Sequence, residues 1–78
     1  MNIPLPRRQY ILRAIDEMDQ QDALLLRMRW GLDDGKPSRI ASLAAYFNIP
    51  QIRVMEELRR VERQVFKRAR KLEDQYEI

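Results

Sequence analysis

The C-terminal third of the chain contains no residue that would interrupt a helix. Prolines occur at positions 4, 6, 37 and 50 and the two glycines at 31 and 35, so neither residue type follows Pro50. Apolar residues in this tract recur at helical spacing and form one stripe: Val54, Leu58, Val61, Val65, Ala69 and Leu72. The tract is therefore predicted to form one long helix, from about Pro50 to Tyr76, whose stripe packs against a core.

The stripe also has a second interpretation. Its spacing of four, three and four residues fits the seam of a coiled coil, which would pair two copies of the chain. Arg68, however, lies where the next seam residue belongs. Core packing is the main prediction, and a helical dimerisation module is kept as an alternative.

The preceding fifty residues divide into three shorter helical segments. Asp19 is the predicted N-cap of the second segment, Gly31 its left-handed end, and Ser38 the predicted N-cap of the third. Asn48 and Pro50 form the turn before the long helix. With no strand pattern, the sequence predicts a single all-α domain of four helices over 1–78, with an N-terminal helical pair (7–31) and a helix-turn-helix (38–76). Trp30 and Tyr46 are predicted to lie in the core or at its edge.

Positive charge is concentrated on the predicted long helix. The chain has 15 basic and 12 acidic residues, but residues 53–72 contain eight basic against three acidic ones, a net charge of +5. Such a local excess favours an acidic partner, with nucleic acid as the first candidate. The alternative is an ordinary solvated helix face, with Glu56–Arg60 and Glu62–Arg63 compensating part of the charge.

The composition argues against several classes of function. The sequence has no cysteine and no histidine, which removes thiolate metal sites, the commonest metal ligand and the usual neutral-pH acid–base group. The segment "LDDGKPS" lacks both the continuing oxygen ligands of a calcium loop and the spacing of a phosphate loop. We therefore expect no enzyme activity, metal, cofactor or small-molecule substrate. With no membrane-spanning run and no signal pattern, we expect a cytoplasmic protein.

Three stretches of the sequence carry a resemblance to a known family. "LLLRMRWGLDDGKPS" (24–38), "FNIP" (47–50) and "RVMEEL" (53–58) resemble region 4 of the primary sigma factors of bacterial RNA polymerase. The resemblance covers about residues 8–72. It implies a compact four-helix domain that docks on the flap of the polymerase beta subunit or meets a sigma-type partner. It also implies that the last helix reads promoter DNA in the major groove. An initiation factor needs a further domain to melt the promoter, so we expect a free-standing region-4-like protein.

The resemblance and the turn spacing together give a set of candidate site residues. We expect Gln51, Arg53 and Glu56 nearest the bases of double-stranded promoter DNA. Phosphate contacts are expected from five basic residues: Arg39, Arg59, Arg60, Arg63 and Lys67. Phe66, at the border of the apolar stripe, is a candidate anchor for a protein partner. Ile52 and Met55 fall at positions where the family reads bases. They leave open a second function, a protein-interaction module that mimics, inhibits or assists a sigma factor without reading DNA.

Overall fold

The computed structural model describes residues 5–77, and this part of the chain is all-helical, with four helices and no strand. The helices are α1 (Arg8–Asp16), α2 (Gln20–Trp30), α3 (Ile40–Phe47) and α4 (Gln51–Tyr76). The predicted fold class, all-α with four helices, is confirmed. The long helix ends at the predicted residue, and it begins one residue later than predicted.

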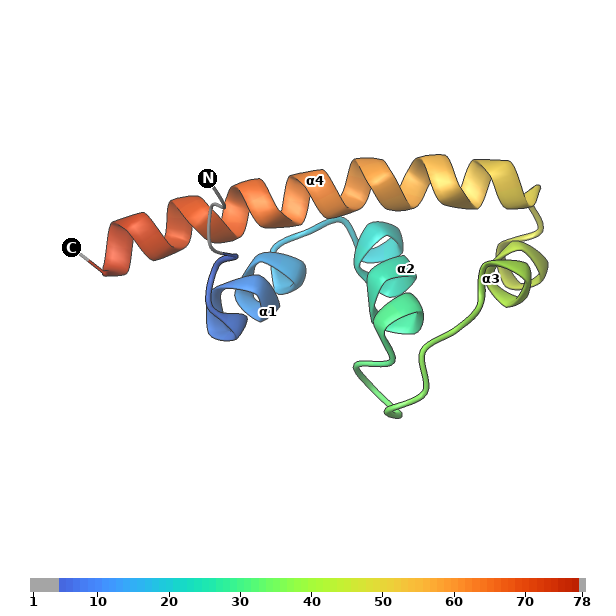
Figure 1. The fold of residues 1–78 in the computed structure, drawn as a ribbon, viewed down its shortest axis with the longest axis horizontal. Coiled ribbons are helices and arrows are strands. Elements are labelled where there is room, and N and C mark those ends of the chain that lie inside the picture. The colour runs from blue at the N-terminus through green and yellow to red at the C-terminus, as the bar shows by residue number, and fades with distance from the viewer. Residues whose placement is uncertain (1–4, 78) are drawn as a thin grey trace.

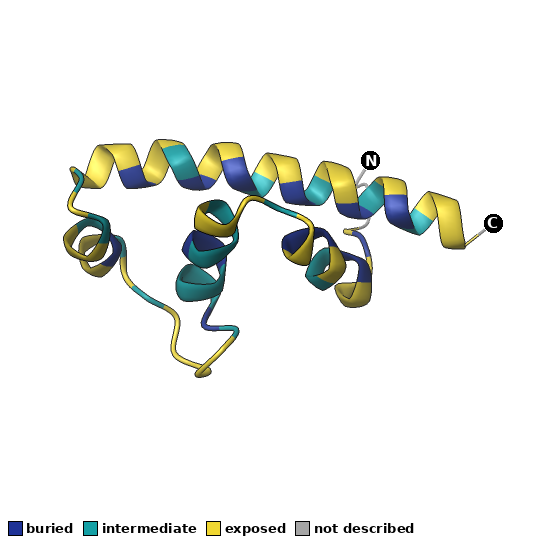
Figure 2. Cartoon of the chain, turned by 180° about the vertical axis from the view of Figure 1, so that it is seen from behind, coloured by how far each residue is buried: buried dark blue, intermediate teal, exposed yellow. Residues whose placement is uncertain are grey.

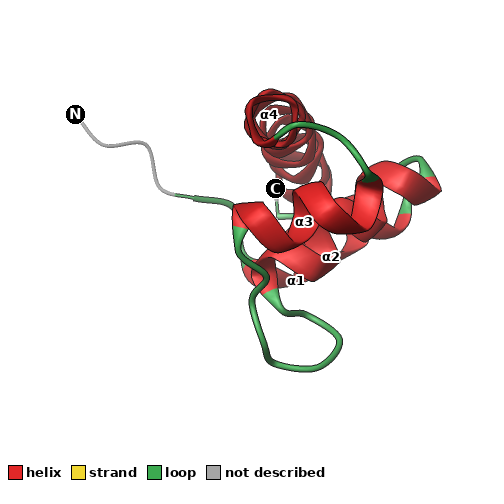
Figure 3. Ribbon diagram, turned by 90° about the vertical axis from the view of Figure 1, so that its right-hand side faces the viewer, coloured by secondary structure: helices red, strands yellow, loops and turns green. Residues whose placement is uncertain are grey.

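Helix α4 spans the length of the molecule, and the three short helices pack against it in turn. Figure 1 shows α1 beside the C-terminal half of α4, α2 near its middle and α3 beside its N-terminus. The domain measures 43 × 27 × 21 Å, and a helix of 26 residues is about 39 Å long. Viewed along α4, the short helices all lie on one side of it (Figure 3). The opposite side of α4 is left open to solvent.

The core lies between α4 and the three short helices. All six residues of the predicted stripe are buried, as are Tyr10, Ala14 and Ile15 of α1, Leu25 and Leu26 of α2, and Leu43 of α3. In Figure 2 the buried positions of α4 face the short helices, and exposed positions line its other side. The stripe is therefore core, as predicted, and it is covered within one chain rather than forming the seam of a dimer.

Three predicted helix boundaries are confirmed by the backbone. The side chain of Asp19 accepts hydrogen bonds from the N–H groups of Gln21 and Asp22 at the start of α2. Gly31 ends α2 in the left-handed conformation, with φ of 66°. Asn48 ends α3 in the same conformation, with φ of 54°. These residues act locally, which explains why the sequence was sufficient to identify them.

Gly31 and Gly35 form a matched pair for testing the connector between α2 and α3. Both have positive φ, but a Cβ at Gly31 would lie 2.6 Å from the backbone nitrogen of Pro37, whereas a Cβ at Gly35 would meet open space. We expect Gly35→Ala to lower the free energy of unfolding by about 1 kcal/mol, from backbone strain alone. Gly31→Ala should cost clearly more, because the loop backbone must also move. Urea unfolding followed by circular dichroism would measure both, and equal losses would contradict this account.

The predicted start of α3 at Ser38 is wrong. The helix begins at Ile40, and its N-cap, Arg39, makes no side-chain capping bond. Ser38 instead hydrogen-bonds the end of the connector to the last turns of α2. Its N–H donates to the carbonyl of Met28 at 2.9 Å, and its own carbonyl accepts from Nη1 of Arg29 at 2.9 Å.

Two aromatic predictions had different outcomes. Trp30 is half-buried against the core, as predicted. Tyr46 is 62% exposed, so its predicted place at the core edge is wrong. The side of α3 that faces the core consists of buried Leu43 and the partly buried Ile40, Ala44 and Phe47, and the Tyr46 ring lies outside it.

Within residues 5–77, no helix combines the length and apolar character needed to cross a bilayer.

Candidate nucleic-acid interface

The side of α4 that faces away from the short helices carries an exposed row of side chains. We define the outer face of α4 as Ile52, Glu56, Arg59, Arg63 and Lys67, all exposed. The helical repeat that buries the apolar stripe turns these positions to the opposite side. The outer face therefore lies on a helix whose opposite side is packed into the core.

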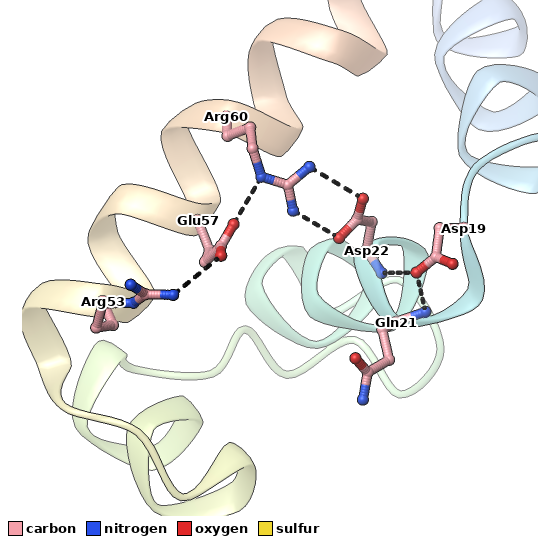
Figure 4. A network of polar contacts seen from close by, with 6 residues as sticks. All are labelled: Asp19, Gln21, Asp22, Arg53, Glu57 and Arg60. Atoms are coloured by element: carbon pink, nitrogen blue, oxygen red, sulfur yellow. Dashed lines mark hydrogen bonds and ion pairs between the residues drawn. The ribbon is translucent and has the colours of Figure 1, made fainter.

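Arg60 is held at the edge of this face by an ion-pair network. Its guanidinium donates to Asp22 of α2, with an N–O distance of 2.9 Å, and to Glu57 at 2.7 Å. Figure 4 shows that Glu57 also faces Arg53, 3.7 Å away, and that Asp22 belongs to the first turn of α2 capped by Asp19. The hydrogen bonds that Arg60 donates to Asp22 and Glu57 raise the pKa of Arg60 above its ordinary value. Arg60 thus links α4 to α2, and a phosphate contact would compete with that link.

Arg68 makes the corresponding link to α1. Its Nε donates to a carboxylate oxygen of Glu17 at 2.9 Å, and a second nitrogen lies 3.4 Å from the other oxygen. The hydrogen bond from Arg68 lowers the pKa of Glu17, and the same contact raises the pKa of Arg68. Two arginines of α4 are therefore paired with acids of other helices. The Glu56–Arg60 pair of the alternative, solvated-face interpretation does not form among the described residues.

The lowered pKa of Glu17 gives a pH prediction. A carboxyl group whose pKa is lower in the folded state than in the unfolded state stabilises the folded state at pH values above its ordinary pKa. This contribution is lost as the pH falls through the folded-state pKa. Wild-type protein should therefore lose melting temperature more steeply below about pH 4.5 than Glu17→Gln. Melting curves from pH 6 to 3 would measure this. Glu56→Gln is the control, since Glu56 has no ion pair with residues 5–77. Parallel curves for wild type and Glu17→Gln would contradict the prediction.

Three cations of the outer face lack the ion pairs that Arg60 and Arg68 form. Arg59, Arg63 and Lys67 are exposed and form no ion pair with any residue in the described range. They follow one another at intervals of four residues, so each is about 6 Å further along the helix axis than the last. The result is a line of positive charge about 12 Å long, none of whose three members forms an ion pair with an acid of residues 5–77.

The residues expected nearest the bases lie in the first two turns of α4. Gln51, Arg53 and Glu56 are all exposed there. Gln51 and Glu56 have no ion pair or side-chain hydrogen bond to another described residue, whereas Arg53 forms an ion pair with Glu57. Ile52 and Met55 lie among them and are 63% and 42% exposed. This end of α4 therefore combines polar groups with two exposed apolar side chains.

Arg39 is separate from the outer face. It is the exposed N-cap of α3, at the opposite end of that helix from the turn that leads into α4. The eight residues of α3 place it about 12 Å from that turn along the helix axis. The structure thus brings Arg59, Arg63 and Lys67 into one line and leaves Arg39 outside it.

Phe66 is half-buried and belongs to an aromatic contact within the chain. Its ring centroid lies 6.0 Å from that of Trp30, and Nε1 of Trp30 donates to a carboxylate oxygen of Glu62 at 3.3 Å. Glu62 therefore faces Trp30, and the Glu62–Arg63 pair of the alternative, solvated-face interpretation does not form among the described residues. A partner of Phe66 would meet only the part of the ring that Trp30 leaves uncovered.

The acidic connector after α2 is tied into the fold. Asp33 pairs with Arg27 at 3.3 Å, and Asp34 accepts from the N–H of Lys36 at 2.9 Å. In the part of the chain that the structure describes, no group of three or more acidic side chains could hold a metal ion. The connector is best described as a structural link between α2 and α3.

A scan of protein-family models and a search of the curated proteins both find no match to this chain.

Proposed function

We propose that this protein is a DNA-binding transcription regulator with a domain of the sigma-region-4 type, which presents the outer face of α4 to the major groove of promoter DNA. One observation carries the proposal. Arg59, Arg63 and Lys67 form an exposed line of charge without ion pairs in the described chain, while Arg60 and Arg68 on the same helix are paired. Such a line suits a polyanion whose charges are themselves regularly spaced.

The arrangement of the helices supports this approach to DNA. The major groove is about 12 Å wide and admits an α-helix. Because α1, α2 and α3 all pack on the far side of α4, DNA could approach the outer face without displacing them. In this arrangement Gln51, Arg53 and Glu56 lie nearest the base edges. The three cations, one to three turns further along, contact the phosphates.

The proposed regulator docks on RNA polymerase, at the flap of the beta subunit. The support is the resemblance of residues 24–38, which form the second half of α2 and the connector to α3. Retention of the protein on an immobilised flap domain would test this part of the proposal separately from DNA binding.

A second candidate function is a protein-interaction module that binds polymerase or a sigma-type partner without reading DNA. The observation that favours it is the exposure of three apolar side chains near the turn between α3 and α4: Tyr46, Ile52 and Met55. Exposed aromatic and aliphatic side chains are common anchors in protein interfaces.

Binding to duplex DNA as a function of salt decides between the two. For the DNA-binding regulator, three phosphate contacts give a slope of about −2.7 in a plot of log affinity against log salt, because each contributes about −0.9. A flat salt response, or no binding at 50 mM salt, would contradict the first candidate. Capture on the flap domain without DNA affinity would support the second.

A further inference from the structure

Two exposed apolar residues occupy the part of α4 that would enter the groove. Ile52 and Met55 are three residues apart and share one side of the helix, with exposed fractions of 63% and 42%. Ile52 is also seven residues from Arg59, so it lies in line with the cations of the outer face. The apolar pair is thus continuous with the positively charged surface.

We propose that Ile52 and Met55 contact the 5-methyl groups of thymine, so that the protein prefers duplexes rich in A·T base pairs. This inference rests on the proposed function, since it requires α4 to lie in the major groove. The chemistry of the groove leads to it. Among the groups that base pairs present there, the thymine methyl is apolar, and the others are hydrogen-bond donors or acceptors. An aliphatic side chain placed against a donor or acceptor leaves it without a partner, which is unfavourable.

The polar residues around the apolar pair are consistent with the same preference. Gln51, four residues before Met55, has a side-chain amide of the kind that pairs with both groups of an adenine edge. Arginine is the usual reader of guanine, but Arg53 lies 3.7 Å from Glu57, within the Asp22–Arg60 network. Gripping guanine would require Arg53 to leave that carboxylate. The first turns of α4 therefore suit A·T pairs better than G·C pairs.

Charge identifies DNA as the occupant of this surface rather than a second copy of the chain. Three cations without ion pairs in the described chain continue the apolar pair along the helix. A second copy would bring the same cations to the contact and repel them, whereas phosphates would neutralise them.

The test uses a duplex in which the register of binding does not matter. Affinity at 50 mM salt would be measured for an alternating A·T duplex and for the same duplex with every thymine replaced by uracil, which lacks only the methyl group. Burying one methyl group corresponds to about a fourfold change in affinity, so two contacts should make the uracil duplex about tenfold weaker or more. A G·C duplex carrying 5-methylcytosine, which places a methyl at the same groove position, should bind more tightly than its unmethylated form.

Variants at the two exposed positions identify the side chains responsible. Ile52→Ala with Met55→Ala should bind the thymine and uracil duplexes equally, with an unchanged salt slope. Ile52→Val with Met55→Leu should keep most of the preference. Circular dichroism should show all variants folded, because both positions are exposed.

The outcomes separate this inference from the proposed function. Salt-dependent binding of wild type with no difference between thymine and uracil duplexes would overturn the inference and leave DNA binding standing. Absence of binding to any duplex at low salt would overturn both. If the double alanine variant instead loses capture by the polymerase flap, or turns a dimer into a monomer in sedimentation, the apolar pair belongs to a protein interface and the inference is wrong.

Discussion

Replacing Arg59, Arg63 and Lys67 with glutamine should reduce the salt slope of DNA binding by about 2.7 units, because three phosphate contacts are lost. The loss of affinity should be greatest at low salt. Between 50 and 200 mM salt, the advantage of wild type over the variant should shrink about fortyfold, the factor that a slope difference of this size gives. Fluorescence anisotropy with a labelled duplex at four or five salt concentrations would measure both quantities.

A matched control tests whether the effect comes from the outer face or from total charge. Arg59→Gln with Arg63→Gln removes two charges from the outer face, and Arg8→Gln with Lys36→Gln removes two from α1 and the connector. In Figure 1, α1 and the connector lie below α4, on the side away from the outer face. The first pair should lower the slope by about 1.8 units and the second should leave it nearly unchanged. Equal effects would mean that binding depends on net charge and not on this line of cations.

Leu43→Ala should give the largest loss of stability among the substitutions considered, about 2–5 kcal/mol. Leu43 is fully buried and is the one buried residue of α3, so truncation leaves a cavity where α3 meets the core. A chain of this length is expected to be stable by only about 4–12 kcal/mol. Chemical unfolding would measure the loss, and DNA affinity should fall with it because α3 positions the turn before α4.

Tyr46→Ala on the same helix is the control for Leu43→Ala. Tyr46 is three residues from Leu43 but 62% exposed, and its main contact is an edge-to-face one with the Phe47 ring, 5.0 Å between centroids. Its truncation should therefore lower the free energy of unfolding by no more than about 1.5 kcal/mol, less than the loss for Leu43→Ala. Similar losses for the two variants would show that α3 is held differently from the arrangement described above.

What the sequence could and could not predict follows from how far apart the interacting residues are. The stripe from Val54 to Leu72 needs only the period of one helix, and Asp19 and Gly31 act on their immediate neighbours. The start of α3 was misplaced because Ser38 bonds to Met28 and Arg29, which lie on the preceding helix. Local capping preferences contain no information about such a contact.

The candidate site was predicted as a set of cations but not as two groups. The expected phosphate contacts on α4 are Arg59, Arg60, Arg63 and Lys67, and nothing in the sequence distinguishes Arg60 from the other three. Its partner Asp22 is 38 residues away in the sequence, and the pairing depends on how α2 crosses α4. Arg68 and Glu17 are 51 residues apart, and the same reasoning applies to them. The division into paired and exposed cations required the three-dimensional arrangement.

The dependence of every short helix on α4 has a consequence for the order of folding. Helices α1, α2 and α3 contain 9, 11 and 8 residues, shorter than the roughly 12–15 residues below which isolated helices are marginal in water. Helix α4 contains 26, but it follows the other three in the chain. During synthesis the first three helical segments leave the ribosome before the helix against which they pack. We therefore expect the domain to fold only after α4 has emerged, with the earlier segments held until then as a nascent chain lacking stable tertiary contacts.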